Sequence, residues 1–283
     1  MTPPVRSSSP LPRARKRFGQ HFLERAWTEK VIATIDPKPE EVFLEIGPGR
    51  GALTLPLLQR ARHVIAFEVD RDLAASLRRE NNPKLTVVEG DFLKVTADRI
   101  RDSLGPVGLA QAKLRVAGNL PYNVASPIVF KVLELFEADT PVEDATFMLQ
   151  REVADRILAS PGTSEYGVLS VLLGQVAEVS RLLALPPGAF RPPPKVHSSL
   201  LRLRWHRPSP APLDLELFRA LVRSVFTRRR KTLSNALLAH QLPAGTSAPT
   251  LAAEAGLDPR QRPGTLDIAA FVRLADAVVG ASR

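Results

Sequence analysis

The four residues Asn119-Leu120-Pro121-Tyr122 combine the groups needed to hold a planar amine beside an aromatic ring. The carboxamide oxygen of Asn119 and the backbone carbonyl of Leu120 accept hydrogen bonds, and the Tyr122 ring can stack on a base. Pro121 restricts the chain between them. An adenine amine is a poor nucleophile, so such a site would act by positioning and preorganised dipoles, on the order of several kcal/mol. These residues suit methyl transfer to a planar amine, although Asn and Pro also form ordinary turns.

A glycine-rich loop, Gly47-Pro48-Gly49-Arg50-Gly51, follows an expected strand. Its glycines place no Cβ between the backbone and a ligand. Glu68 comes 21 residues after Gly47, a spacing at which a carboxylate can accept hydrogen bonds from ribose hydroxyls. Dinucleotide enzymes and S-adenosylmethionine-dependent enzymes share this arrangement. Ala52 could complete the dinucleotide pattern, so the loop alone leaves both classes open.

A third strand end carries Gly90-Asp91-Phe92. The Asp91 carboxylate can accept from an adenine amine, and the Phe92 ring can lie against a base. Gly-Asp is also a common turn. Because Gly47 and Glu68 stand at the ends of the two preceding expected strands, the Gly90–Phe92 segment together with them favours a nucleotide-binding site.

Short β-rich runs alternating with helical stretches must position these residues. Buried strands that alternate with helices predict an α/β fold with a doubly wound parallel sheet, whose ligands bind beyond the carboxyl ends of the strands. The expected strands are Val42–Ile46, Val64–Val69, Leu85–Glu89, Lys113–Ala117, Thr146–Leu149 and Ser198–Arg204. The helical periodicities include Arg71–Arg79, Ile128–Phe136, Leu217–Phe226 and Ile268–Val279.

The chain resembles the small-subunit ribosomal RNA adenine N6,N6-dimethyltransferase family. The matching segments cover nearly the whole chain from residue 15 onward. They are Lys16–Leu23, Glu45–Gly51, the strand ends at Glu68 and Asp91, Asn119–Tyr122, Phe147–Val153, Pro186–Ser198 and Arg229–Thr232.

The resemblance implies a class I S-adenosylmethionine-dependent methyltransferase domain with a Rossmann-like sheet, followed by a small all-helical domain. We expect these domains at residues 15–206 and 207–283, with a disordered basic arm at 1–14 in place of a secretory signal. The implied reaction dimethylates two adjacent adenosines in the 3′-terminal hairpin of 16S rRNA in the 30S subunit, during ribosome biogenesis. S-adenosylmethionine is the implied cofactor, and we expect a cytoplasmic monomer.

The family's contacts can be carried over residue by residue. The implied cofactor contacts are His21, Leu23, Gly47, Gly49, Glu68, Asp91 and Asn119. Relatives often have Asn at the first of these positions. The implied contacts to the target base are Asn119, Leu120, Pro121, Tyr122 and Phe190. A stiff loop, Arg191–Lys195, follows Phe190 and would let its ring press a flipped base against Tyr122.

The positive charge is concentrated at the two ends of the chain. Residues 1–30 and residues 206–283 each carry +5, and residues 31–205 are neutral, which accounts for the net +10. This division favours polyanion contacts from the ends, although solubility is the simpler explanation. The expected RNA-binding residues are Arg228, Arg229, Arg230 and Lys231, with Arg13, Arg15, Lys16 and Arg17 at the other end.

Composition removes several classes of function. The chain has no Cys, so thiolate metal sites and disulfides are excluded, and no apolar run is long enough to cross a membrane. The histidines have no metal-ligand spacing, so no metal is expected. Three alternatives remain: a 23S rRNA methylase of the macrolide-resistance type, a noncatalytic ribosome-assembly or transcription factor, and a nicotinamide oxidoreductase.

Overall fold

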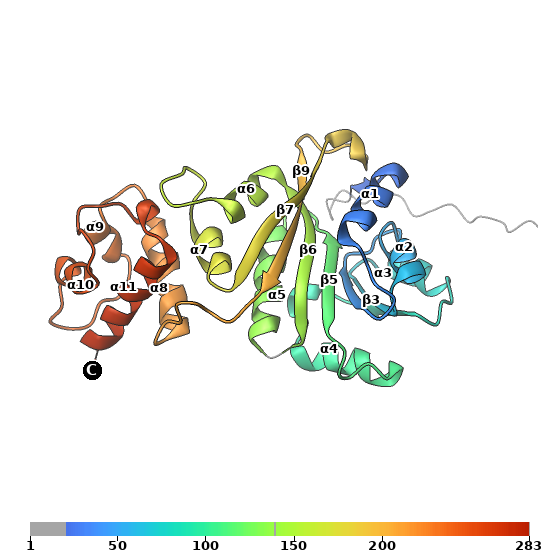
Figure 1. Ribbon diagram of the computed structural model, residues 1–283, viewed down its shortest axis with the longest axis horizontal. Helices are drawn as coiled ribbons and strands as arrows, with labels where there is room; N and C mark the ends of the chain where they lie inside the picture. The colour runs from blue at the N-terminus through green and yellow to red at the C-terminus, as the bar shows by residue number, and fades with distance from the viewer. Residues whose placement is uncertain (1–20, 139, 283) are drawn as a thin grey trace, which may run out of the picture. The chain divides into compact units, whose positions relative to one another are not determined.

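The computed structural model describes residues 21–138 and 140–282, which form two compact units (Figure 1). One unit comprises Met1–Gln150 with Leu182–Leu201, and the other Arg151–Arg181 with Arg202–Arg283. This division differs from the domain boundary expected near residue 206, because Arg151–Arg181 groups with the C-terminal helices. The basic arm expected at residues 1–14 and the cluster Arg13–Arg17 lie outside the described residues.

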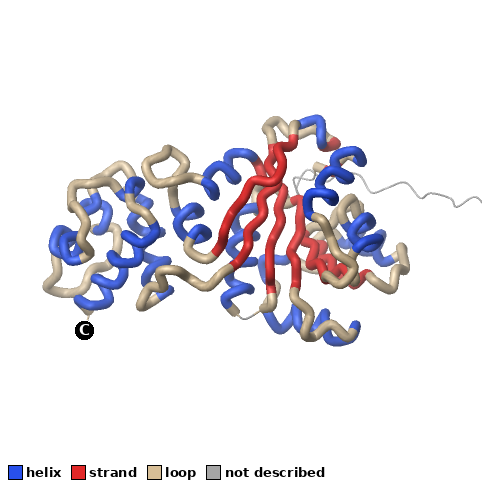
Figure 2. Tube along the Cα trace, viewed as in Figure 1, coloured by secondary structure: helices blue, strands red, loops and turns tan. Residues whose placement is uncertain are grey.

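The main sheet has seven strands in the order β4-β3-β2-β5-β6-β9-β7 (Figure 2). The pairings β4–β3, β3–β2, β2–β5 and β5–β6 are parallel. The strands are β1 (Phe22–Leu23), β2 (Val42–Ile46), β3 (His63–Glu68), β4 (Leu85–Glu89), β5 (Leu114–Asn119), β6 (Val142–Gln150), β7 (Ala177–Leu185), β8 (Phe190–Arg191) and β9 (Ser198–Trp205). The predicted α/β fold with its doubly wound sheet is confirmed.

Helices connect and cover these strands. They are α1 (Arg25–Ile35), α2 (Thr54–Arg60), α3 (Arg71–Arg78), α4 (Ala97–Leu104), α5 (Ala125–Glu137), α6 (Arg151–Leu158), α7 (Val168–Gly174), α8 (Leu215–Thr227), α9 (Leu233–Leu237), α10 (Ala248–Glu254) and α11 (Ile268–Ala281). Helix α3 contacts β4, and α5 contacts β6. Each of the four helical periodicities noted in the sequence lies within an observed helix, apart from one residue at the end of Arg71–Arg79.

The sequence predicts the strands β2, β3 and β4 to within one residue at each end. Every residue of β2 and β3 is buried, which explains why both strands are largely apolar. Strand β7 has no sequence prediction, since Ala177–Leu185 is rich in Ala, Leu, Glu and Arg and its exposure does not alternate strictly. Pairing with β9 makes this segment a strand against its local preference.

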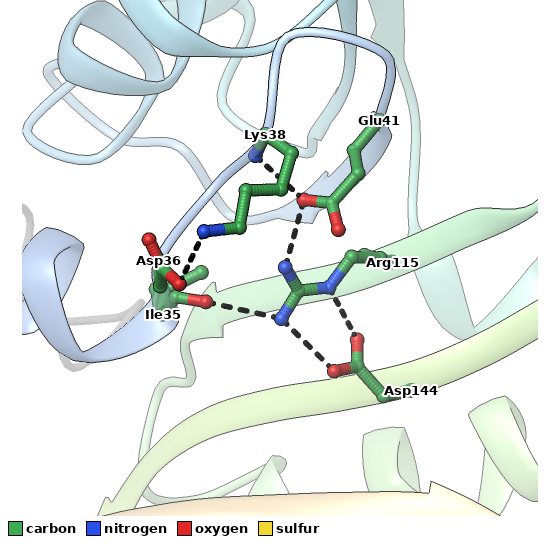
Figure 3. Close-up of polar contacts among 6 residues, drawn as sticks. All are labelled: Ile35, Asp36, Lys38, Glu41, Arg115 and Asp144. Atoms are coloured by element: carbon green, nitrogen blue, oxygen red, sulfur yellow. Dashed lines mark hydrogen bonds and ion pairs between the residues drawn. The ribbon is translucent and has the colours of Figure 1, made fainter.

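A buried guanidinium links three segments of the first unit (Figure 3). Arg115 on β5 donates to both carboxylate oxygens of Asp144 on β6, each at 3.0 Å, and to Glu41 at 2.8 Å. It also donates to the carbonyl of Ile35 at 3.1 Å, which is the last residue of α1. The Arg115 side chain is 9% exposed, so the network fixes the end of α1 against the sheet in a poorly solvated place.

The second unit is helical in its C-terminal part. Asp214 and Asp267 cap α8 and α11 by accepting backbone N–H bonds at the first turn. The rings of Phe226 and Phe271 lie 5.5 Å apart between these helices. No strand occurs in the described residues beyond Trp205, as the sequence predicts.

Replacing Arg115 by Ala should destabilise the protein by about 3–5 kcal/mol, because the buried Asp144 carboxylate would lose two charged hydrogen bonds and the partly exposed Glu41 carboxylate one. The matched control is Arg101→Ala, which breaks an ion pair whose members are 52% and 81% exposed and should cost at most about 1 kcal/mol. Urea unfolding measures both. Equal losses in the two variants would contradict the structural role of the Arg115 network.

Candidate active site

A cavity of about 270 Å³ lies beyond the carboxyl ends of β2, β3, β4 and β5. Its wall includes residues from each predicted motif: Gly47 and Gly49, Glu68, Asp91, and Asn119 to Tyr122. The segment His21–Leu23, which precedes α1, completes the wall. Residues separated by about 100 positions in the chain therefore share one space, and this space belongs to the first unit.

Two glycines permit this convergence for different reasons. Gly47 has φ +66°, a left-handed conformation that L side chains rarely adopt, and a Cβ built there would meet no atom within 4 Å. A Cβ on Gly118 would lie 2.9 Å from the carbonyl oxygen of Ile46. Gly118 therefore lets β5 approach β2 closely, which brings Asn119 next to the loop that starts at Gly47.

Glu68 anchors the glycine loop. Its carboxylate accepts from the backbone N–H groups of Gly49 at 2.9 Å and Asp70 at 2.8 Å. Burial raises the pKa of Glu68, and the two backbone N–H bonds oppose this rise. The side chain is 3% exposed and lines the cavity, where the predicted ribose contact requires it.

The Asp91 segment contributes one polar and one apolar residue to the wall. Asp91 Oδ1 accepts from the backbone N–H of Leu93 at 3.0 Å, and the residue is exposed. Phe92 is 5% exposed and packs edge-on against Phe67 with ring centroids 5.5 Å apart. The carboxylate is thus held by a local turn, and the two rings form an apolar wall beside it.

The amide of Asn119 is oriented by the N-terminal segment. Its Nδ2 donates to the backbone carbonyl of His21 at 2.7 Å. Because a carbonyl only accepts, this bond identifies Nδ2 as the end that faces His21. The carboxamide oxygen is therefore the end that remains to accept a hydrogen bond from a bound amine.

The Tyr122 ring is half-buried at the cavity wall. Its hydroxyl lies 2.8 Å from Ser198 Oγ, and its ring stacks on the His21 ring with centroids 5.3 Å apart. Burial raises the pKa of the Tyr122 hydroxyl, so it stays protonated near neutral pH.

Phe190, which the sequence predicts as a second base-stacking ring, lies in the apolar core. It is 1% exposed, pairs with Leu23 in the short β1–β8 sheet, and belongs to the apolar core. It is also absent from the described residues that line the cavity. Its neighbours in the core enclose the ring, and the predicted contact with the target base stays a prediction.

Glu45 is a cavity residue that the sequence motifs did not single out. It is 2% exposed, and its Oε2 has no hydrogen-bond partner among the described residues. Burial raises the pKa of Glu45 to about 8, and the Glu68 carboxylate contributes to the rise. The only sequence signal was an acid within an otherwise apolar strand, just before the glycine loop.

Comparison with known proteins identifies the family. A family model described as ribosomal RNA adenine dimethylase matches residues 12–276. A protein of Acinetobacter baylyi named ribosomal RNA small subunit methyltransferase A is 42% identical over 271 residues, covering 94% of this chain and 93% of that one. A Burkholderia protein of the same name is 46% identical over 233 residues, covering 81% of each chain.

The chain belongs to the ribosomal RNA adenine dimethylase family.

Solved structures agree with this family membership. A dimethyladenosine transferase from Plasmodium falciparum has a TM-score of 0.72 and 25% identity, covering 90% of this chain and 96% of that one. The 23S rRNA methyltransferase ErmE has a TM-score of 0.63 and 27% identity, covering 91% and 99%. The predicted enzyme class, an S-adenosylmethionine-dependent rRNA adenine dimethyltransferase, is confirmed, and the nicotinamide oxidoreductase alternative is wrong.

The cavity of this family member fits S-adenosylmethionine on structural grounds. The open space beside Gly47 lets a ligand approach the backbone, and Glu45 Oε2 is a buried polar atom without a partner among the described residues. Apolar walls from Phe67, Phe92 and Ile46 suit a purine ring. No group of His, Asp or Glu side chains in the described residues could hold a metal ion.

The predicted RNA-binding residues lie in the second unit, at the turn after α8. Arg229 donates to the carbonyl of Thr163 at 2.9 Å, and Arg228 donates to that of Asn235 at 3.1 Å. Arg230 and Lys231 are exposed and make no ion pair within the described part of the chain. Within residues 21–138 and 140–282, no helix has the length and apolar character of a membrane span.

Replacing Glu45 by Gln should change how stability depends on pH. Because the pKa of Glu45 is raised from 4.5 to about 8 on folding, the folded state binds the extra proton between these values. Wild-type stability should therefore fall as pH rises from about 5 to 9, by up to several kcal/mol from this group. The variant should lack this contribution and gain stability over wild type at pH 9.

Urea unfolding midpoints at pH 5, 7 and 9 measure the effect. Glu29→Gln is the matched control, since Glu29 is 68% exposed and the substitution removes the same charge. A difference between Glu45→Gln and wild type that stays constant from pH 5 to 9 would show that the Glu45 carboxyl is not protonated on folding.

Proposed function

We propose that this chain transfers methyl groups from S-adenosylmethionine to the N6 amines of two adjacent adenosines in the 3′-terminal hairpin of 16S rRNA, within a 30S subunit precursor. The relatives named small subunit methyltransferase A support this choice of RNA at 42–46% identity. The observation that carries the proposal is the shared cavity of Gly47 and Asn119. A methyl donor bound at Gly47 would face an adenine amine bound at Asn119.

The cofactor side of the cavity is assigned to seven residues. Glu68 would accept from the ribose hydroxyls and Asp91 from the adenine amine, while the backbone at Gly47 and Gly49 approaches the ligand closely. The remaining contacts come from His21, Leu23 and Asn119. S-adenosylmethionine supplies the methyl group, as an electrophilic carbon on a sulfonium. All seven residues line the same cavity, which supports their assignment.

The target amine is assigned to Asn119 and Leu120. The Asn119 carboxamide oxygen would accept one N–H of the amine, since Nδ2 already donates to His21. The Leu120 carbonyl would accept the other N–H. Two acceptors hold the nitrogen lone pair toward the incoming methyl group and favour loss of amine planarity. No strong base is needed, because the amine proton can leave to water after the carbon–nitrogen bond has formed.

Tyr122 and Pro121 are assigned to the target base. The Tyr122 ring would stack on the flipped adenine, and the fixed φ of Pro121 sets its position relative to Asn119. Stacking on an aromatic ring contributes about 1–3 kcal/mol per base. This energy would offset part of the cost of removing the adenine from its helix.

The RNA backbone is assigned to the basic turn at residues 228–231. Arg230 and Lys231 are exposed and would contact phosphates, releasing counterions. Arg229 donates one hydrogen bond to Thr163, which holds the turn, and its other N–H groups would remain for a phosphate. We further propose that the protein acts as a monomer in the cytoplasm, where subunit precursors are assembled.

One rival substrate is favoured by a specific observation. ErmE, named as a 23S rRNA methyltransferase, shares the fold at a TM-score of 0.63. The same cavity could therefore serve a 23S target.

Wild-type protein should dimethylate adenosine in unmodified 30S subunits and leave protein-free 23S RNA unmodified. Mass mapping of nucleosides after incubation with labelled S-adenosylmethionine measures both. Asn119→Ala should lower kcat by about 10²-fold or more, because the amine loses an oriented acceptor, while 30S binding is kept. Methylation of 23S RNA alone would establish the rival substrate, and no transfer to either RNA would overturn the proposed function.

Replacing Arg230 and Lys231 together by Ala should weaken RNA binding and reduce its dependence on salt. For every phosphate that the protein no longer neutralises, the slope of log K against log salt should become shallower by about 0.7–0.9. Filter binding of 30S subunits at several salt concentrations measures the slope. Arg260→Ala is the control, since this arginine is 89% exposed in the same unit and pairs with Asp258. A slope unchanged in the double variant would remove the basic turn from the RNA interface.

A further inference from the structure

We propose that His21 and Ser198 are positioning residues that together clamp the side chain of Tyr122, and so set the angle at which the target base is stacked. This inference rests on the proposed role of Tyr122. It assigns Ser198 a part in the reaction, and it gives the side chain of His21 a role distinct from cofactor contact.

Ser198 holds the outer end of the Tyr122 side chain. Its Oγ lies 2.8 Å from the Tyr122 hydroxyl oxygen, and Ser198 is 1% exposed. Ser198 is the first residue of β9, so its backbone is fixed by the sheet. A short hydrogen bond from a rigid, buried partner restrains both the tilt and the reach of the tyrosine.

His21 holds the ring itself. The two ring centroids are 5.3 Å apart, with an angle of 27° between the planes. The His21 Nδ1 lies 2.7 Å from the carbonyl oxygen of Pro192, which can only accept, so Nδ1 carries a proton. That bond restrains the imidazole, and the restrained imidazole in turn restricts rotation of Tyr122.

The same residue connects the two proposed contacts to the target adenine. The His21 backbone carbonyl orients the Asn119 amide, and the His21 ring orients Tyr122. The relative placement of amine acceptor and stacking ring thus depends on one short segment, which continues into β1 and its pairing with β8. Since the bond to Asn119 uses the backbone, side-chain variants of His21 isolate the effect on Tyr122.

A clamped ring matters because the reaction depends on alignment. One face of Tyr122 stacks on His21, so the purine is assigned to the other face. A tyrosine free to rotate would accept the base at many angles, and only some of these place the amine in line with the methyl donor. Loss of the clamp should therefore lower kcat more than it weakens cofactor binding.

The first test detects the contacts of Tyr122 by NMR in the absence of RNA. The sequence contains two tyrosines, Tyr122 and Tyr166, so full-length protein labelled with ¹³C at the tyrosine Cζ gives two assignable NMR signals. Ser198→Ala and His21→Ala should each shift the Tyr122 signal, and Tyr122→Phe assigns it. The control is Ser199→Ala, which removes a hydroxyl from a residue that is also 1% exposed. A Tyr122 signal unchanged in Ser198→Ala would overturn the clamp.

The second test measures how loss of the clamp changes methyl transfer to 30S subunits. We expect Ser198→Ala and His21→Ala each to lower kcat about tenfold, with the dissociation constant of S-adenosylmethionine changed less than about twofold in Ser198→Ala, since Ser198 is not an assigned cofactor contact. In a Tyr122→Phe background, Ser198→Ala should have no further effect, because both variants remove the same hydrogen bond. The positioning role would be overturned if the double variant lost kcat by the product of the two single losses. It would also be overturned if Ser198→Ala and Ser199→Ala had the same kcat.

The two tests separate this inference from the proposed function. If wild type transfers no methyl group but the NMR shifts occur, the proposed function fails and the clamp remains as a structural contact. If wild type is active and the variants leave both the Tyr122 signal and kcat unchanged, the clamp fails and the proposed function stands.

Discussion

The parallel register of β2 between β3 and β5 is the constraint on which the site depends. Ile46 lies opposite Phe67, and Glu45 lies opposite Ala117, so all three strands end at the same level. The residues that follow them are therefore neighbours without any specific attraction between them. The close approach at Gly118, where no Cβ fits against the Ile46 carbonyl, keeps this alignment tight.

The site concentrates groups that are costly to bury and holds them with backbone partners. Glu68 accepts two backbone N–H bonds, while Glu45 has a pKa of about 8 and can remain neutral. Two ionised carboxylates at this place would repel one another, so protonation of one lowers the cost of the pair. The cavity can therefore present acceptors and a donor to a ligand while the surrounding core stays apolar.

The positive charge is concentrated away from most of the residues assigned to the cofactor. Residues 31–205 are neutral overall and include every residue assigned to the cofactor except His21 and Leu23. The basic turn at 228–231 belongs to the helical unit. A cavity binds a small ligand mainly by shape and hydrogen bonds, whereas exposed cations bind a polyanion at long range.

The sequence by itself determined the fold class, the strands β2 to β5, the cofactor loop and the tetrapeptide, because each depends on local periodicity or on a short motif. Only the tertiary structure decided the place of Phe190 in the core, the strand state of β7, the buried acid Glu45 and the contacts of His21 with Asn119 and Tyr122. These features arise where segments far apart in the chain meet. Burial and pairing there depend on partners that no local pattern encodes.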